Sequence, residues 1–243
     1  MYDVYNHRNN VVTESSPSLL GNRLYIASGA GHVWGYNLKT KELDWDFQTG
    51  SDMDGSAIVT TDSCLLASIE KQYIKGKGGA IKLDPQKNPQ DAVVWYFPVD
   101  DKEFAGWEGG IIGSIGINDN YISSDEIHLA AFVGIDGYLY VVDHKSIDST
   151  QTVLGPDSLT IYNTPNLIFK YKTGQSISTP IFVDNKLIVA GYWGIHLFEY
   201  NEKEQFKLIQ KREGTFESTP IAWDNKIYIA SRDGYLYCFG LKN

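Results

Sequence analysis

Carboxylates begin three copies of a phrase that this 243-residue chain repeats, and carboxylates can bind cations or exchange protons. The first residues of the five copies are Glu14, Asp54, Ile112, Ile177 and Glu217. Three acidic groups converging on one point repel one another unless a cation, a basic side chain or raised pKa values relieve them. The pattern therefore indicates a site for a cation or a polar ligand. Capping of backbone N–H groups, or pairing with Arg232 or Lys71, is the structural alternative, and the sequence leaves both open.

Aromatic rings flanked by glycine accompany these carboxylates in the expected loops. The chain contains Gly106-Trp107-Glu108-Gly109-Gly110 and Tyr192-Trp193-Gly194. Glycine lets a ligand approach the backbone closely, and aromatic faces stack on sugars or peptide side chains. Packing of both tryptophans into the channel as core is the alternative. The complete set of candidate ligand-binding residues is Glu14, Asp54, Glu217, Trp107, Glu108, Trp193, Arg232 and His32.

Metal and nucleophile chemistry finds less support. Cys64 and Cys238 give neither a disulfide framework nor a metal-site spacing. The histidines show no metal-ligand spacing and no recognisable Ser/His/Asp order; they are His7, His32, His128, His144 and His196. We therefore expect no catalytic residue and no cofactor, and the sequence leaves a metal site undecided.

An internal repeat positions these residues. The phrase at 217–226 recurs at 177–186 and at 14–23, and weaker copies begin at 54 and 112. Taking the second residue of each copy as a marker gives positions 15, 55, 113, 178 and 218, which are spaced by 40, 58, 65 and 40 residues. Repeats of this length indicate stacked supersecondary units.

The pattern of turn residues and apolar runs in each copy predicts four short strands. Asp-Asn or Gly-Asn turns, which tolerate positive φ, separate the first strand from the second. The expected second strands are 24–27, 187–190 and 227–230, the third strands are 33–36, 138–142 and 235–239, and the fourth strands are 43–47, 93–97 and 167–171. Trp45, Trp95 and Trp223 fall at strand positions and are interpreted as packing residues. Four antiparallel strands in about 40 residues are typical of a propeller blade, so we expect an all-β, five-bladed β-propeller.

The chain length is consistent with a ring closed by its own termini. The last copy, from Ser218 to Asn243, has 26 residues and no fourth strand, and the 14 residues before Ser15 bring it to a full copy of 40. We therefore expect Met1–His7 to be the outer strand of the last blade. The expected single domain, 1–243, comprises blades at 15–54, 55–112, 113–177, 178–217, and 218–243 plus 1–14. A fragment of a larger propeller is the alternative.

Insertions distinguish the second and third copies. Residues 70–78 form an expected basic hairpin between the second and third strands of the second copy, and residues 122–125 precede the second strand of the third. A longer excursion, His144–Pro165, follows the third strand of the third copy. Loop alternation in a propeller predicts that 70–78 shares one face with the connection 101–111, and that His144–Pro165 lies on the opposite face.

The repeated phrases resemble the PQQ-like repeat, also called the quinoprotein-dehydrogenase-like repeat. Asp233-Gly234-Tyr235-Leu236-Tyr237 and Asp136-Gly137-Tyr138-Leu139-Tyr140 match its third-strand pattern. Residues 39–50 match its fourth-strand pattern, with Lys41 where the family usually has glycine. The resemblance covers essentially the whole chain and implies the propeller fold. It leaves activity open, because the family includes alcohol dehydrogenases, outer-membrane assembly lipoproteins and sensor domains.

Departures from that family concern its cofactor. The quinone enzymes typically have eight blades and a vicinal cysteine pair, whereas Cys64 and Cys238 fall in different copies, and no haem-attachment motif is present. We therefore expect the repeat without the quinone. The resemblance favours a periplasmic or cell-surface location, although Met1–Asn6 begins no signal peptide in this chain.

The net charge and the lengths of the apolar runs argue against some classes of binding partner. The formal charge of −9 argues against nucleic acid and anionic membranes, and no apolar run is long enough to span a bilayer. We expect a monomeric, non-catalytic binding or scaffold module that takes a protein segment or a glycan at the mouth of the channel. The alternatives are a carbohydrate-active enzyme that uses Glu14, Asp54 and Glu217, and a residual quinone- or calcium-binding propeller.

Overall fold

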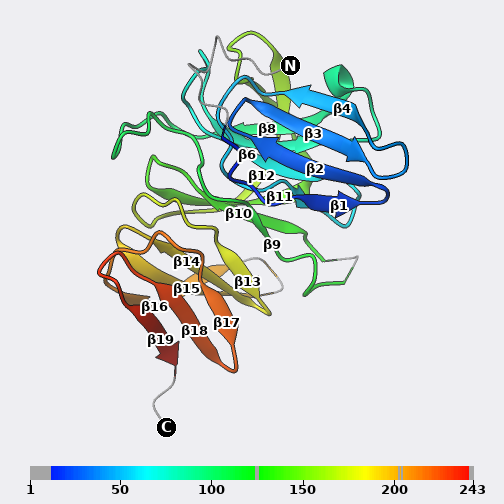
Figure 1. Cartoon of the computed structure of the whole chain (residues 1–243). Coiled ribbons are helices and arrows are strands. Elements are labelled where there is room, and N and C mark those ends of the chain that lie inside the picture. The colour runs from blue at the N-terminus through cyan, green and yellow to red at the C-terminus, as the bar shows by residue number, and fades with distance from the viewer. Residues whose placement is uncertain (1–11, 124–125, 202, 204, 241–243) are drawn as a thin grey trace.

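The chain folds into five antiparallel sheets that follow one another along an arc, from the first sheet at one end to the last at the other (Figure 1). The computed structural model describes residues 12–123, 126–201, 203 and 205–240. Four of the sheets have four strands and the last has three, each in the order of the chain. The described residues contain no helix with the length and apolar character that a bilayer crossing requires.

The strand boundaries follow the predicted ones closely. The first sheet comprises β1 Ser18–Leu20, β2 Arg23–Ser28, β3 His32–Asn37 and β4 Glu42–Gln48. The second comprises β5 Ile58–Val59, β6 Leu65–Ile69, β7 Gly79–Leu83 and β8 Val93–Pro98, with a short 3-10 turn η1 at Pro89–Asp91. The third comprises β9 Gly116–Ile117, β10 Leu129–Val133, β11 Tyr138–Leu154 and β12 Ile161–Lys172. The fourth comprises β13 Ile181–Val183, β14 Lys186–Gly191, β15 Gly194–Tyr200 and β16 Phe206–Arg212. The last comprises β17 Ile221–Trp223, β18 Lys226–Ala230 and β19 Leu236–Gly240.

Tight turns join the strands where the sequence places Asp, Asn or Gly. Asp184 and Asp224 both have φ 49°, Asn225 has φ 56° and Gly21 has φ 61°. Short polar side chains and glycine tolerate this left-handed region, so these turns form at little cost. Lys41, at the position where the family usually has glycine, also has φ 60°.

Apolar layers between consecutive sheets form the core. Four buried clusters lie between the first and second, second and third, third and fourth, and fourth and last sheets. Trp45 and Trp95 are buried in the first two of these clusters, as expected. Each sheet is therefore stabilised mainly by its neighbours along the chain.

Hydrogen bonds between the residues that lie just before the first strands of neighbouring sheets repeat the sequence spacing. The backbone N–H of Ser16 donates to Ser56 Oγ at 2.9 Å, and that of Ser56 donates to Ser114 Oγ at 2.9 Å. Ser114 N–H then donates to Thr179 Oγ1 at 3.0 Å, and Thr179 N–H to Thr219 Oγ1 at 3.3 Å. The sequence separations of these pairs are 40, 58, 65 and 40, so equivalent positions of the sequence repeat occupy equivalent positions in neighbouring sheets.

Two expectations about loops need correction. His144–Pro165 is not an irregular excursion, because most of it extends β11 and β12 into one long hairpin. The tip of this hairpin does not lie on the face opposite the 70–78 loop, since Gly76 N–H donates to Pro156 O at 2.9 Å. Residues 71–78 form a loop with no strand of their own.

A third correction concerns Trp223, which is 75% exposed and does not pack. It lies on the outer face of the last sheet, and no further sheet of the described chain covers that face. The predicted closure of the ring by Met1–His7 lies outside the described residues and stays a prediction.

Candidate functional site

Two sets of equivalent positions line one end of the sheets. The first set is the predicted one, Glu14, Asp54, Ile112, Ile177 and Glu217. The second set lies opposite the first when the antiparallel register of the first and second strands is extended, and it comprises Gly29, Glu70, Ile135, Tyr192 and Arg232.

Five equivalent hydrogen bonds tie the second set to the first. The backbone N–H of each member of the second set donates to the carbonyl oxygen of the residue two positions before the first-set member of the same copy, at 2.9–3.3 Å. In the second copy, for example, Glu70 N–H donates to Asp52 O at 3.1 Å, and in the last copy Arg232 N–H donates to Thr215 O at 3.3 Å. The fold therefore places one residue of each set side by side in every copy, and we call these positions the mouth ring.

The second copy brings acids together in the mouth ring. Carboxylate oxygens of Asp52, Asp54 and Glu70 lie within 4.8 Å of one another. Asp52 and Asp54 belong to the segment between β4 and β5, and Glu70 directly follows β6. Glu70 is only 4% exposed, and its backbone bridges that of Gly110, where an added Cβ would lie 2.8 Å from Glu70 Cα. The glycine is needed for this close approach.

The pKa values of two of these acids are raised strongly. Burial raises the pKa of Glu70 to about 8, and the neighbouring charges of Asp54, Asp52 and Glu108 add to the effect. Burial likewise raises the pKa of Asp54 to about 7, with contributions from Asp52 and Glu14. The cluster thus holds protons near neutral pH that the same groups would lose in water.

The two lysines of the adjoining loop, Lys71 and Lys77, form salt bridges with other acids. Lys71 Nζ pairs with Asp101, and Lys77 Nζ pairs with Asp100 at 2.6 Å. These two pairs join the 70–78 loop to the 101–111 connection, which confirms that both lie on one face. Next to the cluster, Ser68 Oγ is buried without a hydrogen-bond partner among the described residues.

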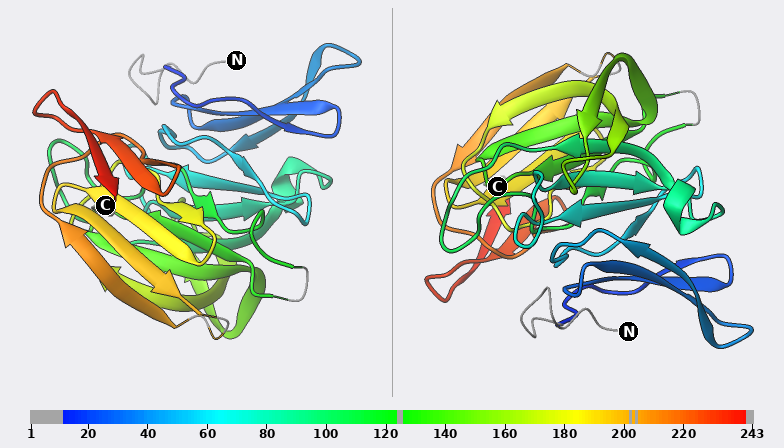
Figure 2. Two further views of the ribbon diagram at one scale, coloured as in Figure 1. Left: turned by 90° about the horizontal axis from the view of Figure 1, so that it is seen from below. Right: turned by 90° about the horizontal axis from the view of Figure 1, so that it is seen from above.

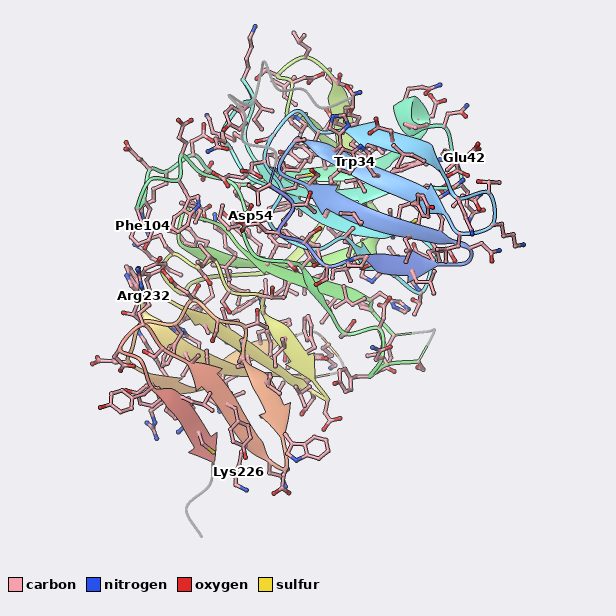
Figure 3. All side chains as sticks on the ribbon, in the orientation of Figure 1. Trp34, Glu42, Asp54, Phe104, Lys226 and Arg232 are labelled. Carbon is pink, nitrogen blue, oxygen red and sulfur yellow. The ribbon has the colours of Figure 1, made fainter. Side chains whose placement is uncertain are left out.

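The last copy combines the same two positions differently. Arg232 Nη1 donates to Glu217 Oε1 at 3.0 Å, and Tyr192 Oη donates to the same oxygen. Burial and this hydrogen bond raise the pKa of Tyr192 to about 12. The ring of Phe104 packs edge-on against Tyr192 at 4.7 Å, so the connection after β8 reaches the fourth sheet. Figure 3 shows Asp54, Phe104 and Arg232 following one side of the arc.

The remaining predicted residues divide between the mouth and the sheets. Trp107 exchanges two backbone hydrogen bonds with Phe104 at 2.9 Å each and is half-buried. Trp193 is 44% exposed, and Lys172 Nζ lies 5.5 Å from its ring centroid. Glu14 and Glu108 are exposed and act on the acidic cluster through their charge. His32 does not join the site: it is buried in the first sheet with Nδ1 2.7 Å from Asp46 Oδ1.

The structure also assembles a buried polar cluster that the sequence analysis missed. Asp119 Oδ1 accepts hydrogen bonds from His128 Nδ1 at 2.7 Å and from His144 Nε2 at 2.9 Å. The other ring nitrogens face lysines, Lys145 Nζ at 2.9 Å and Lys82 Nζ at 3.5 Å. Burial disfavours the charged form of Asp119, but hydrogen bonds from His144, the Thr61 backbone and His128 outweigh it and hold its pKa well below the usual range.

These two clusters differ in what they could hold. His, His and Asp are zinc-type ligands, but both nitrogens of each ring are already engaged, so a metal would have to replace two hydrogen bonds to Asp119. Thr61 and Lys82 come from the second sheet and its turn, so this cluster clamps the second and third sheets together. In the acidic cluster of the mouth ring, no described lysine or arginine forms a salt bridge with Asp54 or Glu70, so these two acids can accept a positively charged group.

Comparison with known proteins supports the fold. No protein-family model matches the chain, and no curated protein matches it. In structure it is similar to BamB from Moraxella catarrhalis, with a TM-score of 0.63 over 94% of this chain and 17% sequence identity. The chain spans 59% of the length of that structure. At this identity the likeness shows the fold alone, a β-propeller whose blades are antiparallel sheets.

Proposed function

We propose that this protein is a protein-binding propeller scaffold whose mouth ring takes an extended protein segment bearing a lysine or arginine. One observation carries the proposal: equivalent positions of two copies hold an acid–arginine pair in one and an acid–acid pair in the other. Glu217 meets Arg232 at 3.0 Å, whereas Asp54 meets Glu70, and no described lysine or arginine forms a salt bridge with either acid.

The physical case is the relief of two crowded acids, the buried Glu70 and the half-buried Asp54, whose pKa values are raised to about 8 and about 7. A cationic side chain entering beside Asp54 and Glu70 would let both ionise and would form charge-assisted hydrogen bonds with them. It would thus play the part that Arg232 plays for Glu217. The net charge of −9 also attracts a basic segment from a distance.

Aromatic rings near the cluster suit a peptide rather than a free ion. Phe104 and Trp107 lie on the connection whose aspartates pair with the 70–78 loop, and Trp193 exposes 44% of its surface next to Tyr192. Amphipathic rings at an accessible surface are frequent anchors for peptide side chains. The likeness to a propeller structure supports a scaffold role.

A peptide-library selection on the immobilised, purified chain tests this proposal. We expect the selected peptides to share a lysine or arginine and to bind more weakly at high salt. Their affinity for the Glu70→Gln variant should be at least tenfold lower than their affinity for the unmodified chain. Glu70→Arg should abolish binding, because it supplies the cation internally as in the last copy. Leu159→Ala, at an exposed position on the long hairpin, is the matched control and should leave affinity unchanged.

Other ligand classes would be recognised in the same experiment. Binding of a glycan array without any peptide would contradict the proposal and favour the glycan reading. Hydrolysis of glycosides would favour an enzyme; Glu217 accepts hydrogen bonds from Tyr192 and Arg232 and lies outside the group of carboxylates whose oxygens meet within 4.8 Å.

A further inference from the structure

The last sheet presents an apolar face to solvent. Ile221, Trp223 and Leu236 are 65%, 75% and 72% exposed. Strand register places all three on one face, because Ile221 lies opposite Tyr228 and Leu236 lies opposite Ala230, two residues further along β18. We call this the far face. The other face of the same sheet packs against the fourth sheet.

Equivalent residues of the preceding sheet are covered. Ile181 and Val183 stand 40 residues before Ile221 and Trp223, and both pack into the core between the fourth and last sheets. The far face of each sheet is thus the surface on which the next sheet lies. In the last sheet the same surface is complete but has nothing on it among the described residues.

The first sheet leaves the opposite kind of face open. Leu19, Leu24, Tyr36 and Leu43 form one row across its four strands, since each is paired with the next in register. Leu19 is 57% exposed and Leu43 is 53% exposed. We call this row the near face.

Sequence equivalence identifies what the near face is built to contact. Leu19, Leu24 and Tyr36 stand 203 residues before Ala222, Ile227 and Phe239, and these three residues pack on the fourth sheet. The near face is therefore the surface with which a sheet lies on the far face of the sheet before it. Four such contacts are made inside the chain, and one face of each kind remains.

We propose that copies of this chain associate head to tail, the far face of one on the near face of another. The two faces belong to sheets at opposite ends of the arc, as the views in Figures 1 and 2 agree, so each copy offers both. Figure 3 marks the two end sheets, with Trp34 and Glu42 on the first and Lys226 on the last. The contact continues an interface that the chain already makes four times, and it removes two exposed apolar faces.

The size of the exposed surface fits such a contact. Three large side chains exposed by about two-thirds leave on the order of 400 Å² of apolar area on the far face alone. Flanking strand edges would add to this area, toward the roughly 800 Å² per partner of a specific interface. Because the two faces differ, the contact is heterologous and can be tested from each side separately.

Light scattering on the size-separated chain, across a range of concentrations, measures the association. The unmodified chain should give a mass of at least twice 27.3 kDa, whereas Trp223→Asp and Leu19→Asp should each give 27.3 kDa. Mixing these two variants should restore a pair, since each retains the face that the other lacks. Leu159→Asp, at an 82% exposed position on the long hairpin, is the control and should associate as the unmodified chain does.

Each alternative outcome overturns the proposal in a recognisable way. A monomeric unmodified chain indicates closure within one chain or two faces without a partner. Association of Leu19→Asp alone indicates contact between two far faces. Circular dichroism and the melting temperature establish that each variant is folded, and Trp223→Ser replaces Trp223→Asp if the latter is not. Peptide binding at Glu70 is measured independently, so failure here leaves that proposal standing.

Discussion

Replacing Glu70 by glutamine should stabilise the protein, and the gain should grow with pH. The carboxyl group of Glu70 is 4% exposed, and its pKa rises from 4.5 to about 8 because of burial first and then of the charges of Asp54, Asp52 and Glu108. Folding therefore requires this group to stay protonated near neutral pH. One pKa unit corresponds to about 1.4 kcal/mol, so at pH 7 the requirement costs at most about 3 kcal/mol.

The sign follows from proton counting. The unfolded chain loses the Glu70 proton above about pH 4.5, whereas the folded chain keeps it until about pH 8. Since the unfolded state then binds fewer protons, the free energy of unfolding falls as the pH rises between these values. Glutamine has no proton to lose, so the advantage of Glu70→Gln should be about 1 kcal/mol at pH 5.5 and about 4 kcal/mol at pH 8.

Urea unfolding followed by tryptophan fluorescence between pH 5.5 and 8.5 measures this difference. Glu42→Gln, at an exposed position of the first sheet, removes the same charge from the chain and should show no comparable pH-dependent gain. An advantage of Glu70→Gln that is the same at all pH values would refute the reasoning. So would a loss of stability, which would mean that the ionised carboxylate makes a contact the structure does not show.

Three further predictions concern the buried Asp119 cluster between the second and third sheets, the turn at Lys41, and quinone-dependent turnover. Asp119→Ala should lower the free energy of unfolding by about 3–5 kcal/mol, because two buried histidines lose their acceptor, while Asp148→Ala on the exposed hairpin should change it little. Lys41→Gly should raise it by up to about 1 kcal/mol, since glycine suits φ 60°, whereas Lys39→Gly in the same turn should not. Dye reduction with alcohols, pyrroloquinoline quinone and calcium should show no saturable turnover, since Cys64 and Cys238 lie in the second and last copies; turnover would contradict this expectation.

The repeat register made the sheets and their contacts predictable. Strands, turns and the hydrogen bonds just before the first strands all follow from one set of marker positions, because each copy buries the same face against its neighbours. The prediction for Trp223 failed for the same reason. A residue equivalent to buried ones is buried only if a further sheet covers it, and sequence equivalence does not show where the series of sheets ends.

The histidine–aspartate cluster could have been found from the sequence. His128 and His144 are each eight residues from Asp136 at the turn between β10 and β11, and antiparallel register places such residues opposite each other. Their backbones pair accordingly, with His144 N–H donating to His128 O at 2.8 Å. The sequence spacing of these histidines matches no metal motif, and only the hairpin register brings them together.

The mouth ring can also be predicted only from the antiparallel register of the strands. Its first set of positions belongs to the repeated phrase, whereas its second set follows the second strands. Glu70 begins an inserted loop, so its equivalence to Tyr192 and Arg232 is not visible in the sequence. In the antiparallel register the five copies have five different residues at this one position: glycine, glutamate, isoleucine, tyrosine and arginine.

At these positions the backbone geometry is the same in every copy, whereas the side chains differ. The backbone hydrogen bonds that hold the ring are made in every copy, so they belong to folding and do not depend on the side chain. Side chains at the same positions are then free to differ, and they place a cation beside the acid in the last copy and a second acid in the second copy. A buried acid–acid pair lowers stability near neutral pH without any compensation inside the described chain. A positive group that binds beside the second copy's acids would offset that cost, and the proposal of binding at the second copy rests on this difference from the last copy, where Arg232 already pairs with Glu217.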